Sequence, residues 1–201
     1  MEEYAYTYQG DEYYCFSGTN VLRNKQGIME KEALNVAERE ITSIKIAMLL
    51  ENPIRGSFGF THLCNIHKFI FYDIYDWAGR LRQGEFLMKG NSIFCRGQYI
   101  KSSADRIFEQ LKKENKLRKL KKESFIERLS FYMGEVNALH PFREGNGRAS
   151  REFFRELAYM AGYNCDFRVL NKDEHLEADI SAFNKNYKLL IKLLKIAVRE
   201  R

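Results

Sequence analysis

The residues most able to carry chemistry lie in one short stretch, HPFREGNGR at positions 140–148. It places an imidazole, a carboxylate, two glycines and two guanidinium groups close together in the chain. An imidazole with an ordinary pKa near ~6.5 can take a proton from an incoming hydroxyl. This stretch therefore predicts a site in which a base, an acid and an anion cradle act together, with His140 as the base.

The segment from Gly145 to Gly147 predicts a phosphate-binding loop at the start of a helix. Glycines permit positive φ, so successive backbone N–H groups can converge into a concave nest. The helix that follows adds its N-terminal N–H groups and the positive end of its dipole. Arg148 and Arg151 are three positions apart and share one helix face, where both can reach phosphate oxygens.

Glu144 predicts a cation at this cradle, because a carboxylate would otherwise repel a polyphosphate. Mg²⁺ commonly uses one protein carboxylate together with substrate phosphates. With His140 as a base, the natural chemistry is nucleotide-dependent group transfer. Taken singly, each residue also fits a structural role, since glycines can cap a helix and Glu144 can complement its dipole. The combination of residues favours the catalytic interpretation.

Helices are favoured as the elements that position this loop, because the chain has only two prolines and an all-β sandwich normally needs more turn residues. Pro141 disfavours helical geometry at His140, so one helix should end there and the next should begin near Gly147. A glycine–asparagine turn between two apolar runs predicts a β-hairpin within residues 79–96. Apolar residues at helical spacing predict helices at about 30–51, 61–75, 102–120, 124–139, 147–161, 172–184 and 186–199.

Composition bounds the class of protein. Hydrophobic residues make up 45% of the chain and aromatic residues 14%, which is typical of a folded domain rather than a disordered one. The cysteines occur singly, which favours free thiols in a reducing cytoplasm. The first ten residues do not resemble a signal peptide, and no apolar run is long enough to span a bilayer. We expect a cytoplasmic protein with no membrane partner.

The stretch HPFREGNGR, extended to Arg151, resembles the signature of the Fic (filamentation induced by cAMP) family, HPFx(D/E)GNGRxxR, at every specified position. The segments YCFSGTNVLRNKQGI at 14–28 and YDWAGRLRQGEFLMKG at 75–90 are similar to the regions that precede the Fic core and open its flap. The resemblance implies an all-α, Fic-type helical domain with a small β-hairpin flap over the active-site loop. It also implies one domain over 1–201, divided into an irregular N-terminal region at about 1–29, the flap at about 79–96 and the motif loop at 140–151.

The resemblance to bacterial cell filamentation proteins implies a protein adenylyltransferase, which transfers AMP from ATP to a hydroxyl side chain of a target protein. His140 is then implied to deprotonate the target hydroxyl and Glu144 to hold Mg²⁺. The implied ATP-binding residues are Gly145, Asn146, Gly147, Arg148 and Arg151. Relatives of the Doc type replace the second motif glycine with a larger residue, so the intact Gly147 favours AMP transfer, and phosphocholine transfer stays open.

The flap is implied to bind an extended target segment by strand addition, which reads the backbone more than the side chains. The implied target-binding residues are Met88, Lys89, Gly90, Asn91, Ser92 and Ile93. No [ST]xxxE[GN] pattern of an internal inhibitory helix occurs in the chain. We therefore hypothesise inhibition in trans by a small antitoxin-like partner whose glutamate reaches Arg151, with an unregulated enzyme as the alternative.

Two other features permit a different class of function. The net charge is +6 and the segment LKKENKLRKLKKE at 111–123 is strongly basic, so a nucleic-acid-binding or scaffold protein with a relic Fic loop is the alternative. A solvated helix end explains this segment better, because no aromatic residue is interleaved for base stacking. His62 and His67 lack the HExxH spacing of a zinc site, so we expect them to serve helix packing.

Overall fold

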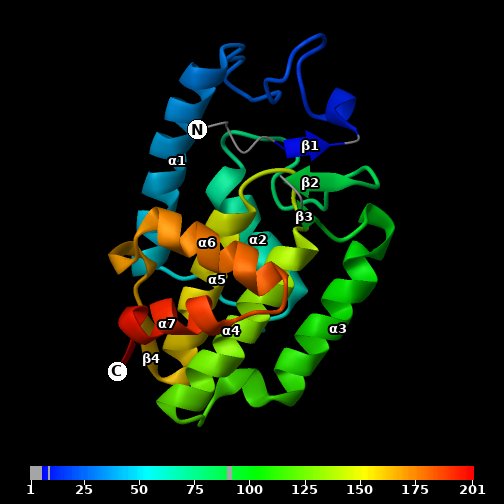
Figure 1. The fold of residues 1–201 in the computed structure, drawn as a ribbon. Coiled ribbons are helices and arrows are strands. Elements are labelled where there is room, and N and C mark those ends of the chain that lie inside the picture. The colour runs from blue at the N-terminus through cyan, green and yellow to red at the C-terminus, as the bar shows by residue number, and fades with distance from the viewer. Residues whose placement is uncertain (1–5, 9, 90–91) are drawn as a thin grey trace.

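Helices form the body of the molecule, as the sequence predicted (Figure 1). The computed structural model describes residues 6–8, 10–89 and 92–201. Within that part of the chain the α-helices are α1 (Lys31–Glu51), α2 (Phe60–Phe71), α3 (Ile100–Lys113), α4 (Lys122–Leu139), α5 (Asn146–Ala161), α6 (Lys172–Phe183) and α7 (Lys188–Ala197). Short 3-10 helices cover Asp11–Tyr13, Gly97–Tyr99, Asn115–Leu117 and Phe167–Val169.

The helices α4 and α5 lie at the centre of the core and carry the loop between them. The apolar stripe of α4 is buried throughout, at Ile126, Leu129, Met133 and Val136. On α5, Ala149, Phe153 and Leu157 are buried and pack against α2 and α4. Burial of both helices on their apolar faces therefore fixes the two ends of the motif loop.

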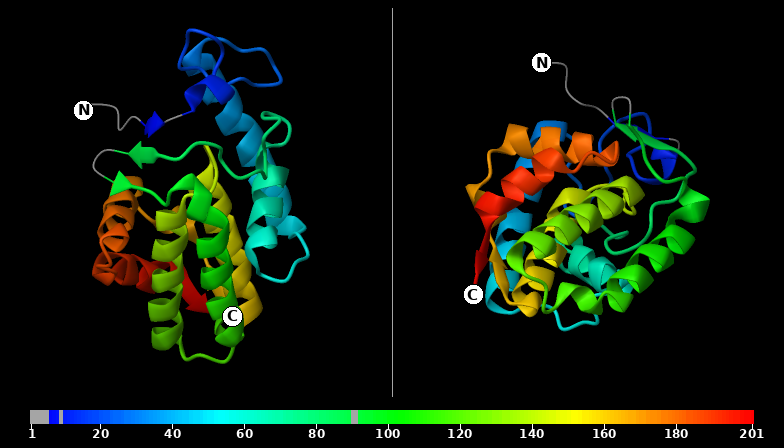
Figure 2. Two further views of the ribbon diagram at one scale, coloured as in Figure 1. Left: turned by 90° about the vertical axis from the view of Figure 1, so that its right-hand side faces the viewer. Right: turned by 60° about the horizontal axis from the view of Figure 1, so that its bottom comes forward.

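The predicted hairpin is part of a three-stranded antiparallel sheet in the order β1-β2-β3, at one end of the helical body (Figure 2). The strands are β1 (Tyr6–Tyr8), β2 (Leu87–Lys89) and β3 (Ser92–Ile93), and Thr7 lies opposite Met88, which lies opposite Ile93. The expectation of an irregular N-terminal region was wrong for β1. An open hairpin edge presents unpaired N–H and C=O groups, and β1 satisfies those of β2.

Three helix ends differ from their predicted positions, and the first is that of α2, which ends at Phe71 and not near 75. The last helix ends at Ala197 and not near 199, because β5 (Val198–Glu200) pairs with β4 (Tyr163–Cys165). The helix predicted to run to 120 ends at Lys113, and the chain then enters a left-handed turn with φ of 53°, 55° and 61° at residues 115 to 117. Leu117 is fully buried in this turn. Long-range pairing and burial thus override the local helical pattern.

The apolar residues of α1 and α7 differ in burial. The apolar face of α7 docks on the core through Leu190, Leu193 and Leu194. On α1, by contrast, Ile44 and Met48 are 63% and 47% exposed. The four cysteines are free thiols, and no helix in the described part of the chain is long and apolar enough to cross a membrane.

Candidate active site

The motif loop begins where α4 ends. His140 caps α4 in the left-handed conformation, with φ 44° and ψ 62°, and its N–H bonds the carbonyl of Val136 at 3.2 Å. The helix thus stops at the residue before Pro141, as predicted. Arg82 holds this corner, because its Nε donates to the His140 carbonyl at 2.9 Å and its backbone N–H donates to the Pro141 carbonyl at 2.9 Å.

The imidazole of His140 is oriented by two neighbours. Its Nδ1 lies 3.3 Å from the carbonyl oxygen of Asn137. A carbonyl only accepts, so Nδ1 carries the proton and Nε2 carries the lone pair. The ring stacks on Phe94, with 3.8 Å between centroids and 20° between planes, and only 5% of the residue is exposed. The geometry fits a general base whose Nε2 is the proton acceptor.

The predicted phosphate nest lies at the N-terminus of α5. Gly145 is in the left-handed region with φ 79°, and a Cβ there would lie 2.2 Å from the ring of Phe71. The first intrahelical bond runs from Ala149 N to the Gly145 carbonyl, so the preceding N–H groups of the first turn are oriented toward the helix end. Both the backbone conformation and the close packing therefore require glycine at position 145.

Asn146 closes the loop on itself. Its side-chain Oδ1 accepts from the backbone N–H of Phe142 at 2.9 Å, and its Nδ2 donates to the Phe142 carbonyl at 2.8 Å. Both polar atoms of the amide are thus used within the loop. In this arrangement Asn146 holds the nest in shape, and its side-chain contact with phosphate stays a prediction.

A histidine that the sequence assigned only to packing supports the loop from beneath. His67 of α2 is fully buried, and its ring stacks on Phe142 at 3.8 Å between centroids. The backbone N–H of Gly79 donates to Nδ1 at 2.9 Å, so Nε2 carries the proton and donates to the Glu144 carbonyl at 2.9 Å. Burial lowers the pKa of His67 to about 4, which keeps it neutral in this role.

The carboxylate of Glu144 lies at the mouth of the nest, with 28% of its side chain exposed. Its Oε1 accepts from the backbone N–H of Gly145 at 2.7 Å and lies 3.6 Å from Nη2 of Arg148. Across residues 6–8, 10–89 and 92–201, no three His, Cys, Asp or Glu side chains form a metal site. The site fits Mg²⁺, because this ion takes one carboxylate and completes its shell with phosphate oxygens and water.

Arg148 is held by helix α1, a contact that the sequence pattern did not reveal. Its Nη2 donates to Oε1 of Glu38 at 2.6 Å, and its Nη1 donates to Oγ1 of Thr42 at 3.3 Å. The hydroxyl of the buried Tyr75 donates to the other oxygen of Glu38. The guanidinium also lies over the ring of Phe71, 4.8 Å from its centroid. These contacts fix the guanidinium of Arg148 beside the nest.

Arg151 lies one helical turn further along α5, on the same side. Its Nη1 passes 3.1 Å from the position that a Cβ on Gly147 would occupy. Burial lowers the pKa of Arg151, and of the two nearby charges Asp179 raises it and Arg148 lowers it. A partly buried arginine near another arginine fits an anion, because a phosphate would offset both the desolvation of the guanidinium and the repulsion between the two cations.

A pocket of about 770 Å³ continues from these arginines between α1, α5 and α6. Its walls include Arg148 and Arg151 at one end and apolar side chains such as Ile46, Leu50 and Leu176. The pocket is thus basic at the nest and has a mixed lining beyond it, with charged side chains such as Arg155 and Asp173 beside the apolar ones.

The flap lies over the catalytic corner. The backbone N–H of Phe94 donates to the Leu87 carbonyl at 3.0 Å, and the N–H of Cys95 donates to the carbonyl of Ala138 in α4 at 3.0 Å. Met88 is half-buried and Ile93 is 54% exposed. For Lys89 and Ser92 the structure describes the backbone, and Gly90 and Asn91 lie outside the described residues.

The structure thus brings His140, Glu144 and the nest from Gly145 to Arg151 onto one loop and helix end, with the flap above them. Sequence reasoning missed Glu38, because nothing in the pattern of α1 links it to the loop. It assigned His67 only to packing, since a hydrogen bond to a distant carbonyl leaves no local signal.

The sequence and the fold of this chain are similar to those of known proteins. The model of the Fic/DOC family matches residues 57–158. The protein adenylyltransferase VbhT of Bartonella schoenbuchensis is 40% identical over 177 residues, which cover 88% of this chain and 37% of VbhT. The "Probable protein adenylyltransferase Fic" of Salmonella typhimurium is 35% identical over 96% of this chain and 94% of its own length. The crystal structure of BepC from Bartonella tribocorum with bound AMPPNP superposes with a TM-score of 0.89 at 25% identity, covering 94% of this chain and 98% of that one.

Proposed function

The chain belongs to the Fic/DOC family and is an enzyme of the nucleotidyltransferase type, and we propose that it transfers AMP from ATP to a hydroxyl side chain of a target protein. The observation that carries this proposal is the placement of a buried, oriented His140 and the N-terminus of α5 at the two ends of one short loop. A base and a phosphate-binding site at the two ends of one short loop can promote attack of a hydroxyl on a bound phosphate.

In the proposed reaction the target hydroxyl loses its proton to Nε2 of His140. Its oxygen forms a bond to the α-phosphorus, the bond from that phosphorus to the bridging oxygen breaks, and pyrophosphate leaves. The N–H groups at the start of α5 hold the oxygens of the α- and β-phosphates and stabilise the charge that develops there. When bound at Glu144, Mg²⁺ supplies neutralisation of the phosphate charge.

The arginines support this orientation of ATP. Arg148 is fixed beside the nest by Glu38, and Arg151 lies one turn beyond it. Both are placed to bind the outer phosphates, which leaves the α-phosphate toward His140. Gly147 supports the same orientation, because a side chain there would press on the guanidinium of Arg151.

We assign the target segment to the outer edge of β3. β2 pairs on both sides, with β1 and with β3, so β1 and β3 are the two edge strands of the described sheet. An extended peptide can add to such an edge through main-chain hydrogen bonds. Phe94 directly follows β3 and stacks on His140, so a hydroxyl presented at this edge approaches the base.

We also propose that a small partner protein inhibits the enzyme in trans through a glutamate that pairs with Arg151. No hydrogen bond or ion pair to the Arg151 side chain occurs among the described residues. The lining of the adjoining pocket includes Ile46 and the exposed Leu50 of α1. An amphipathic helix with one glutamate matches this combination of charge and apolar surface. We place this activity in the cytoplasm, since free thiols fit a reducing compartment.

The test is incubation of the purified chain with a bacterial lysate, Mg²⁺ and ATP labelled at either the α- or the γ-phosphate. AMP transfer predicts protein labelled from α-labelled ATP only. His140→Ala should lower this labelling by about 10²–10⁴-fold with ATP affinity retained, and Glu144→Ala should abolish the Mg²⁺ dependence of ATP binding. Label from the γ-phosphate would show a kinase instead. Absence of label from both, together with a salt-sensitive shift of DNA, would favour the nucleic-acid-binding alternative.

A further inference from the structure

The N-terminal segment binds the catalytic loop through an ion pair between a buried arginine and an aspartate whose side chain is 41% exposed. Asp11 accepts from both Nε and Nη2 of Arg143, at 3.1 and 2.7 Å, through the same oxygen Oδ1. Only 8% of the Arg143 side chain is exposed. Arg143 occupies the position between Phe142 and Glu144 that the family signature leaves open. The loop therefore uses its unspecified residue to hold a segment more than a hundred positions away.

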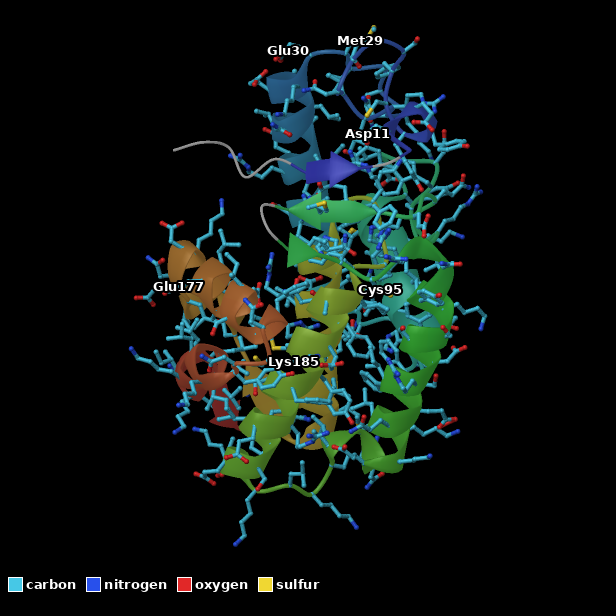
Figure 3. All side chains as sticks on the ribbon, turned by 45° about the vertical axis from the view of Figure 1, so that its right-hand side comes forward. Asp11, Met29, Glu30, Cys95, Glu177 and Lys185 are labelled. Carbon is cyan, nitrogen blue, oxygen red and sulfur yellow. The ribbon has the colours of Figure 1, made fainter. Side chains whose placement is uncertain are left out.

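The same segment also binds the flap. β1 pairs with β2 through residues 6 to 8, and Asp11 follows the end of this strand by three positions (Figure 3). A connection of three residues spans at most about 10 Å. A movement of β2 away from the loop beyond this limit would therefore break either the β1–β2 pairing or the Asp11–Arg143 pair.

A third contact lies on the other side of Asp11. Tyr14 is buried, and its hydroxyl accepts from the backbone N–H of Gln83 at 2.8 Å. Its ring belongs to a small apolar cluster with Leu87 of β2 and with Phe94, the residue that stacks on His140. The segment thus contacts the residues at the base of the flap, next to the position where Phe94 stacks on His140.

We propose that residues 6–8 and 10–14 act as a brace that fixes the distance between the flap and the motif loop, with Asp11 as its positioning residue. The proposal rests on the proposed function, because it assigns the brace to presentation of the target hydroxyl. Among the described residues, Asp11 makes no hydrogen bond or ion pair to Glu144, to the N-terminus of α5 or to Arg148 and Arg151, which form the phosphate site. Loss of the brace therefore impairs the target side of the reaction and spares ATP binding.

The test compares Asp11→Asn with Asp11→Glu, which keeps a carboxylate, and with Glu12→Gln, which removes a charge from an exposed neighbour. Amide hydrogen exchange is measured on peptides covering 83–95 and, as a folding control, on α4. Asp11→Asn should speed exchange in the flap by about tenfold, the ratio expected for loss of a charge-assisted hydrogen bond, with α4 unchanged. Asp11→Glu should restore most of the protection, and Glu12→Gln should match the wild type.

The same variants are tested for MgATP affinity by calorimetry and for transfer of label to lysate proteins. Asp11→Asn should keep the Kd for MgATP within about twofold and lose about tenfold in labelling. Flap exchange equal to that of the wild type would overturn the brace, as would an equal loss of MgATP affinity and labelling. If the wild type labels no protein, the proposed function fails, while the exchange measurement still decides whether the brace exists.

Discussion

Replacing His67 with phenylalanine tests how far the active-site loop depends on a buried histidine. The imidazole accepts from the N–H of Gly79 and donates to the carbonyl of Glu144, both at 2.9 Å. Phenylalanine keeps an aromatic ring against Phe142 but provides neither hydrogen bond. Leaving a buried donor or acceptor without its hydrogen-bond partner lowers the free energy of unfolding by about 1–3 kcal/mol. We therefore expect the free energy of unfolding to fall by about 3 kcal/mol at pH 7.

The pH dependence supplies a sharper signature. Burial lowers the pKa of His67 to about 4 in the folded state, against about 6.5 in the unfolded chain. Between these values the unfolded state binds the proton more readily, so stability present above pH 6.5 is lost as the pH falls toward 4. At about 1.4 kcal/mol for each pKa unit, going from pH 7 to pH 4.5 costs the wild type about 2–3 kcal/mol through this group. The variant has no such group, so the difference between the two proteins should shrink to about 1 kcal/mol or less.

The assay is urea unfolding followed by circular dichroism at pH 7 and pH 4.5, at one ionic strength. His175 also has its pKa lowered to about 4 by burial, but it titrates in both proteins and cancels in the comparison. His67→Gln is the matched control, because its amide can donate to the Glu144 carbonyl and cannot titrate in this range. At pH 7, His67→Gln should lower the free energy of unfolding less than His67→Phe does. An equal difference between wild type and His67→Phe at both pH values would refute the reasoning.

The remaining predictions concern the nest and its arginines. Gly145→Ala should destabilise the fold and abolish ATP binding, because alanine is strained at φ 79° and its Cβ would collide with Phe71; normal MgATP affinity by calorimetry would contradict this. Gly147→Ala should weaken ATP binding more than AMP binding, since its Cβ would displace the guanidinium of Arg151, and equal loss for both nucleotides would argue against it. Glu38→Gln should raise the KM for ATP by about tenfold with a smaller change in kcat, because the charge-assisted bond that fixes the first motif arginine is weakened; steady-state kinetics that show an unchanged KM would disprove the positioning role.

The helices and the motif loop could be predicted from local sequence. A helix is read from apolar spacing, and the stop at His140 follows from Pro141, whose ring restricts only the residue before it. The nest was predicted for the same reason, since a glycine at φ 79° and a helix N-terminus are both local properties. All of these determinants lie within a few residues of the structure that they specify.

The contacts that hold the loop in place are visible only in the tertiary structure. Asp11, Glu38 and His67 reach the loop from three separate segments of the chain. Each contact depends on how whole elements pack, and no spacing within one element encodes it. The strand β1 and the early end of α3 were missed for a related reason, because pairing with a distant strand and burial of one leucine outweigh a weak local preference. The sequence therefore determined which groups can do the chemistry, whereas long-range packing determined how those groups are held.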